Sequence, residues 1–498
     1  MPAAKTPPKR RPAKRKVPVR TVPVQRKVVQ VNRHLPAKYD AAQIGFDNTR
    51  HWANADALDA VTANSSGVRT KLRQRSRYEV ANNSYARGIV NTLANDVIGT
   101  GPRLQMRTGN RDLDRRIEKE FATWSKMIGL AAKLRTMRKA RVQDGEAFAI
   151  MFSNNSLWPL PTLDIHLVEA DQIESPTIAA AGKYTDGIRF DANGTPVGYA
   201  VLKKHPGGGY SDVTKYGEIA AEYILHWFRT DRPGQIRGVP EITSALPLFA
   251  QLRRYTLAVI TSAETAAEWT LFLKTNAPPD SGATQLEDGE FAAIEIERNM
   301  MTALPEGWDP FQLKPEQPTT TYGMFKAEIL NEIARCLGMP YNVAAGNSSG
   351  YNYASGRLDK QTYFRNIAID QSSCDVEVLD RIFAAWMAEA AFMLEIDAAV
   401  ASDHQWFWKG HEHVDPVKEA KAQAQRLANN TTTLAREMAD QGLDWEEELE
   451  QRALEVAAEK RLGLTSAAAP APAPADDGED GDDDVDEDDE DEDKGAEK

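Results

Sequence analysis

Apolar residues recur with a helical period over most of the chain and with a strand period over one central stretch. Between Ser76 and Ile98 they keep the spacing of one helix face, and Gly101-Pro102 closes the segment. The ranges 112–124 and 130–144 predict two more helices. Residues 146–230 instead contain β-type runs separated by Gly, Asn, Asp and Pro turns. The pattern predicts an α+β fold that is mainly helical.

The strands of the central stretch are predicted by five short runs. They are 147–152, 163–168, 187–190, 197–202 and 223–228. His205 stands beside three glycines, which suggests a metal or phosphate site at first sight. No partner lies at ligand spacing from it, so the sequence favours a hairpin tip.

The longest predicted helix runs from Pro240 to Lys274 and would span roughly 50 Å at 1.5 Å per residue. Its many alanines give it a narrow face that neighbouring helices can approach closely. Pro247 lies near the start, where a kink costs less than in the middle of a helix. Residues 275–323 are rich in Pro, Gly and acids and predict a projecting excursion, with one compact element at 291–296.

A helix, an exposed loop and a second helix follow between residues 324 and 369. Apolar residues recur every four positions in the first helix, at Phe325, Ile329, Ile333 and Leu337. Gly338 and Pro340 stop this helix, and the loop after them is almost entirely Gly, Asn, Ser, Ala and Tyr. The second helix begins near Ser355, with Leu358, Thr362, Arg365 and Ile369 on one face. Such a loop is more often functional than structural.

Three helices are predicted after this loop region, over 376–394, 418–434 and 445–462. The first is amphipathic, the second begins after Pro416, which suits a first helical turn, and the third is dense in Glu. Residues 466–475 form an Ala/Pro linker, and 476–498 form an acidic low-complexity tail.

The net charge of −13 averages over tails of opposite sign. Residues 1–30 carry ten Lys or Arg and no acid, whereas 476–498 carry sixteen acids and two lysines. The basic arm, residues 1–38, is predicted to be disordered. It is interpreted either as a contact for nucleic acid or an acidic protein, or as a solubilising or processed leader. The chain's own acidic tail is a third candidate partner.

Other bulk properties exclude several classes of protein. No apolar run is long enough to span a bilayer, so we expect no transmembrane helix and no membrane partner. The basic N-terminus lacks the apolar core of a signal peptide. Cys336 and Cys374 are the only cysteines, which predicts no disulfide framework and fits synthesis in a reducing cytoplasm.

The sequence contains no recognisable catalytic constellation. A P-loop, an HExxH helix and a G-x-S-x-G elbow are all absent, and His411-Glu-His413 has the wrong spacing for two ligands on one helix face. We therefore expect no catalytic residue, no metal and no cofactor. The basic helix 130–144 is interpreted as a solvated surface, with a nucleic-acid contact as the alternative.

Several short motifs occur in a definite order along the chain. LGMPYNVAAGN at 337–347 is followed by NYASGRLDKQTYFR at 352–365. The other motifs are NNSYARG with NDVIGTG (82–101), DGEAF (144–148), EAD (169–171), GQIRGVP (234–240) and VDPVKE (414–419). The first pair is similar to the LGVPY…NYSS-(A/G)-R signature of the lambda-like portal proteins of tailed bacteriophages, and the others resemble motifs of that family in the same order. The resemblance covers about Tyr39 to Leu462.

The resemblance implies a ring-forming portal fold with wing, stem, clip and crown regions. After the basic arm, residues 39–235 would form a wing-like α+β region and 236–275 a long stem helix. A clip-like excursion would occupy 276–323, and a second stem and tunnel region 324–375. A helical crown would occupy 376–463, and the disordered linker and tail 464–498.

The resemblance also implies a function without catalysis. A homo-oligomeric ring, usually of twelve subunits in this family, would form a DNA channel at one capsid vertex. Made in the host cytoplasm, it would initiate capsid assembly with the major capsid and scaffold proteins and dock the terminase large subunit. Double-stranded DNA would pass through it during packaging and ejection, and neck proteins would connect it to the tail.

Two sets of residues follow as candidates. The polar and aromatic loop residues would contact DNA in the tunnel: Asn347, Ser348, Tyr351, Asn352, Tyr353, Ser355 and Arg357. The remaining motif residues would be structural: Gly234, Arg237, Gly238, Pro240, Gly338, Pro340, Asp415 and Pro416. A second interpretation of the loop is that Asn352 or Ser355 caps the following helix, and the two interpretations are compatible.

A protein of another class remains an alternative. The charged tails on a helical body also fit a non-channel binding protein of the chaperone kind. An enzyme with an unrecognised site is a third reading, but no set of residues predicts one.

Overall fold

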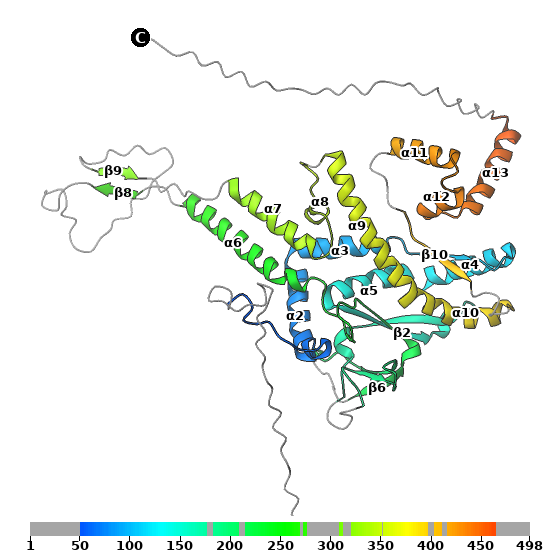
Figure 1. Cartoon of the computed structure of the whole chain (residues 1–498), viewed down its shortest axis with the longest axis horizontal. Coiled ribbons are helices and arrows are strands. Elements are labelled where there is room, and N and C mark those ends of the chain that lie inside the picture. The colour runs from blue at the N-terminus through cyan, green and yellow to red at the C-terminus, as the bar shows by residue number, and fades with distance from the viewer. Residues whose placement is uncertain are drawn as a thin grey trace, which may run out of the picture. The chain divides into compact units, whose positions relative to one another are not determined.

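The described residues form helices, two three-stranded antiparallel sheets and two two-stranded ones (Figure 1). The computed structural model describes residues 50–176, 183–208, 215–268, 272–275, 308–311, 320–350, 352–396, 403–410 and 416–464. The chain divides into a unit ending at Leu58, of which the described part holds a turn, and a unit beginning at Asp59 that holds every element below. The second unit is α+β and mainly helical, as the sequence predicted.

Five helices open this unit. They are α1 (Ala60–Ala63), α2 (Ser66–Asn82), α3 (Ser84–Ile98), α4 (Arg111–Met127) and α5 (Leu130–Asp144). The prediction of one continuous helix from 76 to 98 was wrong, because one helix ends at Asn82 and the next begins at Ser84. The Asn83 side chain accepts hydrogen bonds from the backbone N–H groups of Tyr85 and Ala86 and so caps a new helix.

Each sheet of the central region has three strands. One has the order β3-β2-β7, with β2 (Glu146–Ser153), β3 (Leu163–Val168) and β7 (Ile224–Phe228). The other has the order β4-β5-β6, with β4 (Ile188–Phe190), β5 (Pro196–Leu202) and β6 (Tyr216–Ala220). All five predicted strands are confirmed, whereas β6 was missed.

The side chains on the two faces of β2 belong to two separate hydrophobic cores. Ala147, Ala149 and Met151 belong to the main core, which the helices complete. Phe148 points to the opposite face, where it packs with residues of the second sheet such as Tyr199, at a ring-centroid distance of 6.1 Å. Successive side chains of a strand alternate in this way, so one strand serves both cores.

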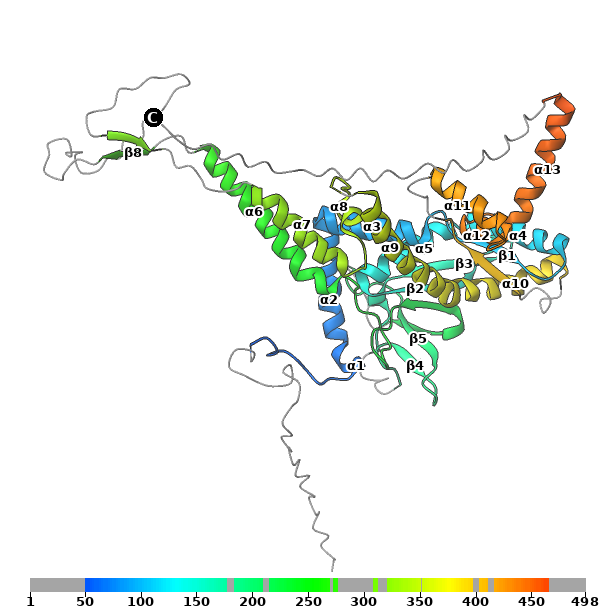
Figure 2. The same cartoon turned by 45° about the horizontal axis from the view of Figure 1, so that its top comes forward.

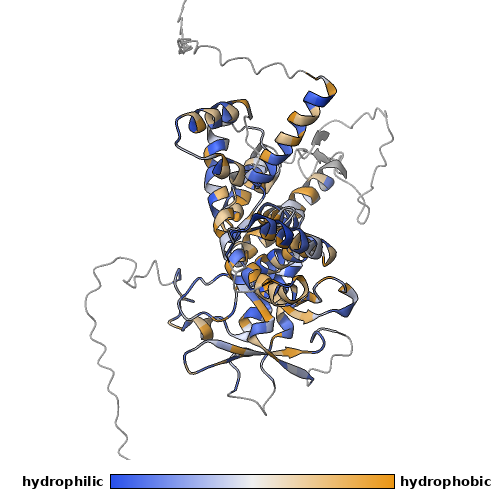
Figure 3. Ribbon diagram, turned by 90° about the vertical axis from the view of Figure 1, so that its right-hand side faces the viewer, coloured by the Kyte–Doolittle hydropathy of each residue, from blue (hydrophilic) through white to orange (hydrophobic). Residues whose placement is uncertain are grey.

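Aromatic side chains fill the main core where α4 meets α10 (Asp380–Leu394) and β10 (His404–Phe407). Phe121 lies edge-on to Trp386 with 5.2 Å between the centroids, and Trp406 is 5.6 Å from Phe121. Strand β10 pairs with β1 (Arg103–Met106) in a two-stranded ribbon. In Figure 3, orange, hydrophobic stretches of ribbon occur in helices and strands alike.

Helices α6 (Leu246–Glu268) and α7 (Thr320–Arg335) lie side by side in both views (Figures 1 and 2). The predicted start at Pro240 was wrong, because α6 begins at Leu246 with Pro247 in its first turn. The predicted end was also wrong, because β8 (Phe272–Thr275) pairs there with β9 (Trp308–Phe311). The compact element at 291–296 lies outside the described residues.

The chain then continues through α8 (Tyr341–Ala345), α9 (Tyr353–Cys374), a π-helical turn at Asp375–Leu379 and α10 without a break after α9. The second helix of the helix–loop–helix is therefore confirmed, beginning two residues earlier than predicted. The face bearing Leu358 and Ile369 is the exposed face, with exposed fractions of 65% and 63%.

The C-terminal part contains α11 (Pro416–Ala428), α12 (Leu434–Asp440) and α13 (Trp445–Leu462). The predicted helix 418–434 is confirmed as α11, but its predicted end was wrong, because α11 ends at Ala428. Asn430 then adopts a positive φ of 53°, and Thr433 caps the separate helix α12. None of the helices in the described ranges is both long enough and apolar enough to cross a membrane.

Candidate functional site

The predicted channel residues lie in the loop between α8 and α9 and at the start of α9. Asn347 and Ser348 are exposed, and the Asn347 carboxamide oxygen accepts hydrogen bonds from Ser349 N (2.9 Å) and Oγ (2.7 Å). These local bonds form an Asx turn that presents the loop to solvent. Tyr351 lies outside the described residues, and only the backbone of Tyr353 is described.

Asn352 caps α9, as one interpretation of the sequence predicted. Its side-chain oxygen accepts from Ser355 N at 2.8 Å, and Ser355 Oγ donates to the Asn352 carbonyl at 3.2 Å. Asn352, Ser355 and Arg357 are exposed. The structure therefore places Asn352, Ser355 and Arg357 at one exposed helix start, with Asn347 and Ser348 in the loop before it. Their contact with DNA stays a prediction.

The beginning of the loop is fixed to the core. Gly338 has φ 62°, and a Cβ there would lie 2.4 Å from Asn366 Nδ2 on α9. The positive φ favours glycine here, whereas the exposed Asn366 side chain could move away from an added Cβ. Pro340 is extended and precedes α8, and α8 packs against α3 with Ala344 buried. The loop thus leaves a rigid base before it reaches its exposed residues.

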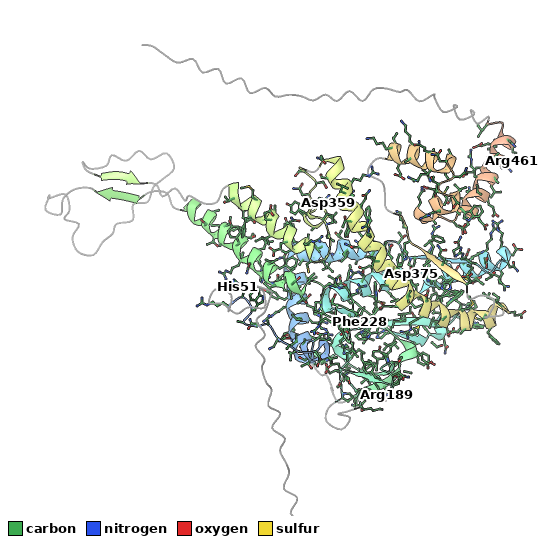
Figure 4. The ribbon with its side chains drawn as sticks, in the orientation of Figure 1. His51, Arg189, Phe228, Asp359, Asp375 and Arg461 are labelled. Atoms are coloured by element: carbon green, nitrogen blue, oxygen red, sulfur yellow. The ribbon has the colours of Figure 1, made fainter. Side chains whose placement is uncertain are left out.

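Helix α9 is anchored along its second half. Tyr363 Oη donates to Asp96 at 2.8 Å, and Gln371 Nε2 donates to the Val97 carbonyl at 2.9 Å. From Ser355 to Thr362, by contrast, no side chain is buried. In Figure 4, Asp359 marks the exposed first half and Asp375 the point where the π turn begins.

Three motifs that are distant in sequence converge on the buried carboxylate of Glu146. Arg237 Nε lies 2.9 Å from each Glu146 oxygen, and its Nη2 lies 2.7 Å from Oε1. Arg237 also donates to the carbonyls of Ile173 (3.0 Å) and Ala170 (3.2 Å). Arg73 forms a further ion pair with Glu146. Arg237, predicted to be structural, is 1% exposed.

Two glycines allow the strand and the motif loop to cross at this point. A Cβ on Gly238 would lie 2.0 Å from the Gly145 carbonyl oxygen, and one on Gly145 would lie 2.4 Å from Val239 C. Gly145 also has φ 92°. Backbone therefore packs directly on backbone, which only glycine permits. Gly234 has φ 79° with open space around it, so its requirement is conformational.

The neighbouring charges and burial together determine which groups of this cluster are ionised. Burial alone would raise the pKa of Glu146, but Arg237, His226 and Arg73 hold it well below the usual value. Burial lowers the pKa of His226, although its Nε2 lies 3.0 Å from Glu146. His226 is therefore neutral near pH 7, and its Nε2–H donates to the carboxylate.

A second buried cluster corrects the interpretation of the basic helix 130–144. Arg138 and Arg141 are 2% and 3% exposed, so neither a solvated surface nor a nucleic-acid contact describes them. They form ion pairs with Glu241 and Asp370. The amphipathic pattern of the helix could not predict that these arginines are buried. Arginine is buried almost only when it is paired, and the partners of Arg138 and Arg141 are distant in sequence.

His205 does acquire carboxylate neighbours that the sequence could not place. It lies in the turn between β5 and β6, with Nε2 3.2 Å from Glu169 and 3.6 Å from Asp171. However, Nδ1 accepts from Gly207 N at 3.0 Å, which leaves the neutral ring protonated on Nε2. Arg77 Nη1 also lies 2.6 Å from Asp171. The Arg77 guanidinium therefore already places a positive charge beside this carboxylate. His411, His413 and Asp415 lie outside the described residues.

An exposed apolar groove was not indicated by any motif. It has a volume of about 680 Å³ and is lined by Trp158, Pro159, Ala391, Phe392, Met393 and Glu395. Trp158 is 70% exposed and Phe392 88%. Glu389 of α10 accepts from the backbone N–H groups of Thr162 (2.6 Å) and Leu163 (3.2 Å), which fixes the β2–β3 connection beside α10.

Comparison with known proteins adds a family match over most of the chain. Residues 48–371 match the model described as phage portal protein, lambda family. The "probable portal protein" of Halomonas phage phiHAP-1 is 24% identical over 428 residues, covering 79% of this chain and 81% of the relative. The "portal protein" of Escherichia phage N15 is 21% identical over 449 residues, covering 78% and 84%.

A solved structure is similar at a lower level. A chain in the virion of a native gene transfer agent particle has a TM-score of 0.42 and 14% identity. The match covers 75% of this chain and 93% of that chain.

Proposed function

Because this chain belongs to the lambda family of phage portal proteins, we propose that its copies form a ring, usually of twelve in the family, around a channel for double-stranded DNA. As a portal protein of the capsid vertex, it acts through the shape of the channel that its subunits form, and not through catalytic groups. We propose that it is not an enzyme: it performs no catalysis, and ATP hydrolysis belongs to the terminase.

The helix–loop–helix of α7, α8 and α9 supports the channel proposal. Its base is buried, whereas Asn347, Ser348 and the start of α9 are exposed. A ring repeats these groups once per subunit around the channel. Neutral polar and aromatic groups touch DNA without the deep binding that arrays of Lys and Arg give, because phosphate contacts dominate affinity. DNA held in this way can slide.

We assign the regions of the family to the elements on this basis. The elements from α1 to β7 are the wing, α6 and α7 the stem, and the chain between them the clip. Helices α10 to α13 are the crown. The clip docks the terminase large subunit and later the neck proteins, and the wing meets the major capsid and scaffold proteins during assembly in the host cytoplasm.

Replacing the loop tyrosines tests the channel role. We expect Tyr351→Ala combined with Tyr353→Ala to reduce the DNase-protected DNA per capsid while ring assembly stays normal. Tyr223→Ala is the matched control, since Tyr223 is an exposed tyrosine (52%) beside β7 in the wing. Wild-type packaging and retention in the double variant would contradict the role of the loop.

A further inference from the structure

Four charged side chains, three of them buried, join three parts of the fold beneath the exposed loop. Arg138 and Arg141 come from α5, Glu241 lies just before α6, and Asp370 is on α9. Arg138 Nη2 lies 3.1 Å from Glu241 and 2.6 Å from Asp370. Arg141 lies 2.9 Å from each of the same two carboxylates. The side chains of both arginines and Glu241 are at most 3% exposed, and that of Asp370 is 19% exposed.

This arrangement restrains α9 in two directions. Each oxygen of Asp370 faces a different guanidinium, Oδ2 that of Arg138 and Oδ1 that of Arg141. Such charge-assisted pairs are short and directional, so they oppose both rotation of the helix and sliding along its axis. A purely apolar contact would give comparable burial without this preference for one register.

Neighbouring contacts act on the same half of α9. Ser373 Oγ accepts from Trp227 Nε1 at 3.1 Å, and the Arg141 guanidinium lies 5.0 Å from the Trp227 ring. Tyr363 and Ile367 are buried on the same helix face. In the described residues of 352–362, side-chain hydrogen bonds are local to the helix start and to Thr362 with Leu358. The exposed half therefore depends on the clamped half for its direction.

We infer that Arg138, Arg141 and Glu241 are positioning residues, which hold α9 through Asp370 and so set where the loop at 347–357 stands. This rests on the proposed channel role of that loop. The same cluster joins α9 to the base of α6, because Glu241 precedes that helix and its carbonyl oxygen lies 2.9 Å from Cys336 Sγ at the end of α7. Force on the loop is thereby resisted by both stem helices and by α5.

Hydrogen exchange on the purified full-length chain tests this inference. Asp370→Asn keeps the shape of the side chain and removes its charge. We expect faster exchange confined to α9 and the loop before it, and a loss of DNase-protected DNA from capsids carrying the variant. Asp359→Asn, on the exposed half of the same helix, is the matched control and should leave both readouts unchanged.

The outcomes separate this inference from the proposed function. Unchanged exchange in α9, or an increase spread evenly over the chain, would overturn the positioning role. Faster exchange in α9 with normal packaging would retain that role and contradict the channel role of the loop. If Asp370→Asn does not fold, the charge-balanced pair Arg141→Gln with Asp370→Asn is measured in the same way, and the same results support or overturn the inference.

Discussion

At the scale of single residues, the fold depends on charged side chains that are buried in the protein interior. Glu146 and Arg237 are each 1% exposed. Buried pairs add little over apolar packing, but breaking one is costly because the remaining charge stays unpaired. The motif residues around Glu146 therefore act as a unit, and each depends on the others.

Replacing Arg237 tests this dependence. Arg237→Met should lower the free energy of unfolding in urea by about 3–5 kcal/mol, because Glu146 loses its bidentate partner. Arg229→Met is the control: Arg229 pairs with Asp231, and both side chains are nearly half exposed. That variant should change stability by about 0–1 kcal/mol. Equal effects of the two variants would contradict the buried-charge account.

Glu118 makes the contact between α4 and α13 sensitive to pH. Burial, together with repulsion by Asp444, Asp114 and Glu447, raises its pKa to about 7 although Met106 N–H donates to it. The folded state therefore binds a proton that the unfolded chain releases near pH 4.5. This contribution is complete below about pH 4.5 and is lost as the pH rises through about 7.

The corresponding measurement is hydrogen exchange of the first turns of α13 at pH 5.5 and 8, corrected for the intrinsic rates. Protection should be greater at pH 5.5 in the wild type. Glu118→Gln keeps an acceptor for Met106 N–H but cannot titrate, so the difference between the two pH values should shrink. An unchanged difference in this variant would assign the effect to another group.

At the scale of elements, the C-terminal helix α13 is held mainly by polar contacts at its beginning. Gln105 Nε2 donates to Asp444 at 2.7 Å, Arg111 lies 2.6 Å from Glu446, and Arg115 pairs with Glu450. No residue of α13 is buried, and its ribbon alternates between hydrophilic and hydrophobic turns (Figure 3). Exposed pairs of this kind are weak and are screened by salt.

Gly442 provides a direct test of this docking. It has φ 73°, and a Cβ would lie 2.7 Å from the Trp408 carbonyl oxygen and 2.8 Å from Lys409 Cα. Gly442→Ala should therefore release α13, seen as faster proteolysis between α12 and α13. Gly463→Ala carries similar backbone strain, at φ 68°, with open space around the new Cβ. Equal proteolysis of the two variants would show that strain alone, and not docking, is responsible.

The order and type of most elements could be predicted from the sequence, because periodicity and turn residues act locally. Asn83, which ends α2 and caps α3, shows where this fails: a local side-chain bond breaks a period that continues across it. Ion-pair partners are even harder to predict from the sequence, since Arg138 and Asp370 are 232 positions apart. The loop at 347–357 was located by composition alone, but the charges that hold α9 beneath it required the fold.

At the scale of the whole molecule, the central claim is that many copies of this chain close into a ring. A subunit in a ring contacts its two neighbours through different surfaces, so each copy must present two contact faces. The exposed apolar residues Leu358 and Ile369 on α9, and Trp158 and Phe392 at the groove, lie on separate described surfaces available for such contacts.

The most direct measurement is the mass of the full-length protein in solution by light scattering, with negative-stain imaging of the same sample, alone and with the capsid and scaffold proteins of its phage. We expect a homogeneous species near twelve times the chain mass of 55.1 kDa, with a central hole. A sample that stays a monomer or a compact dimer under both conditions would contradict ring formation, and would favour a binding protein with charged tails.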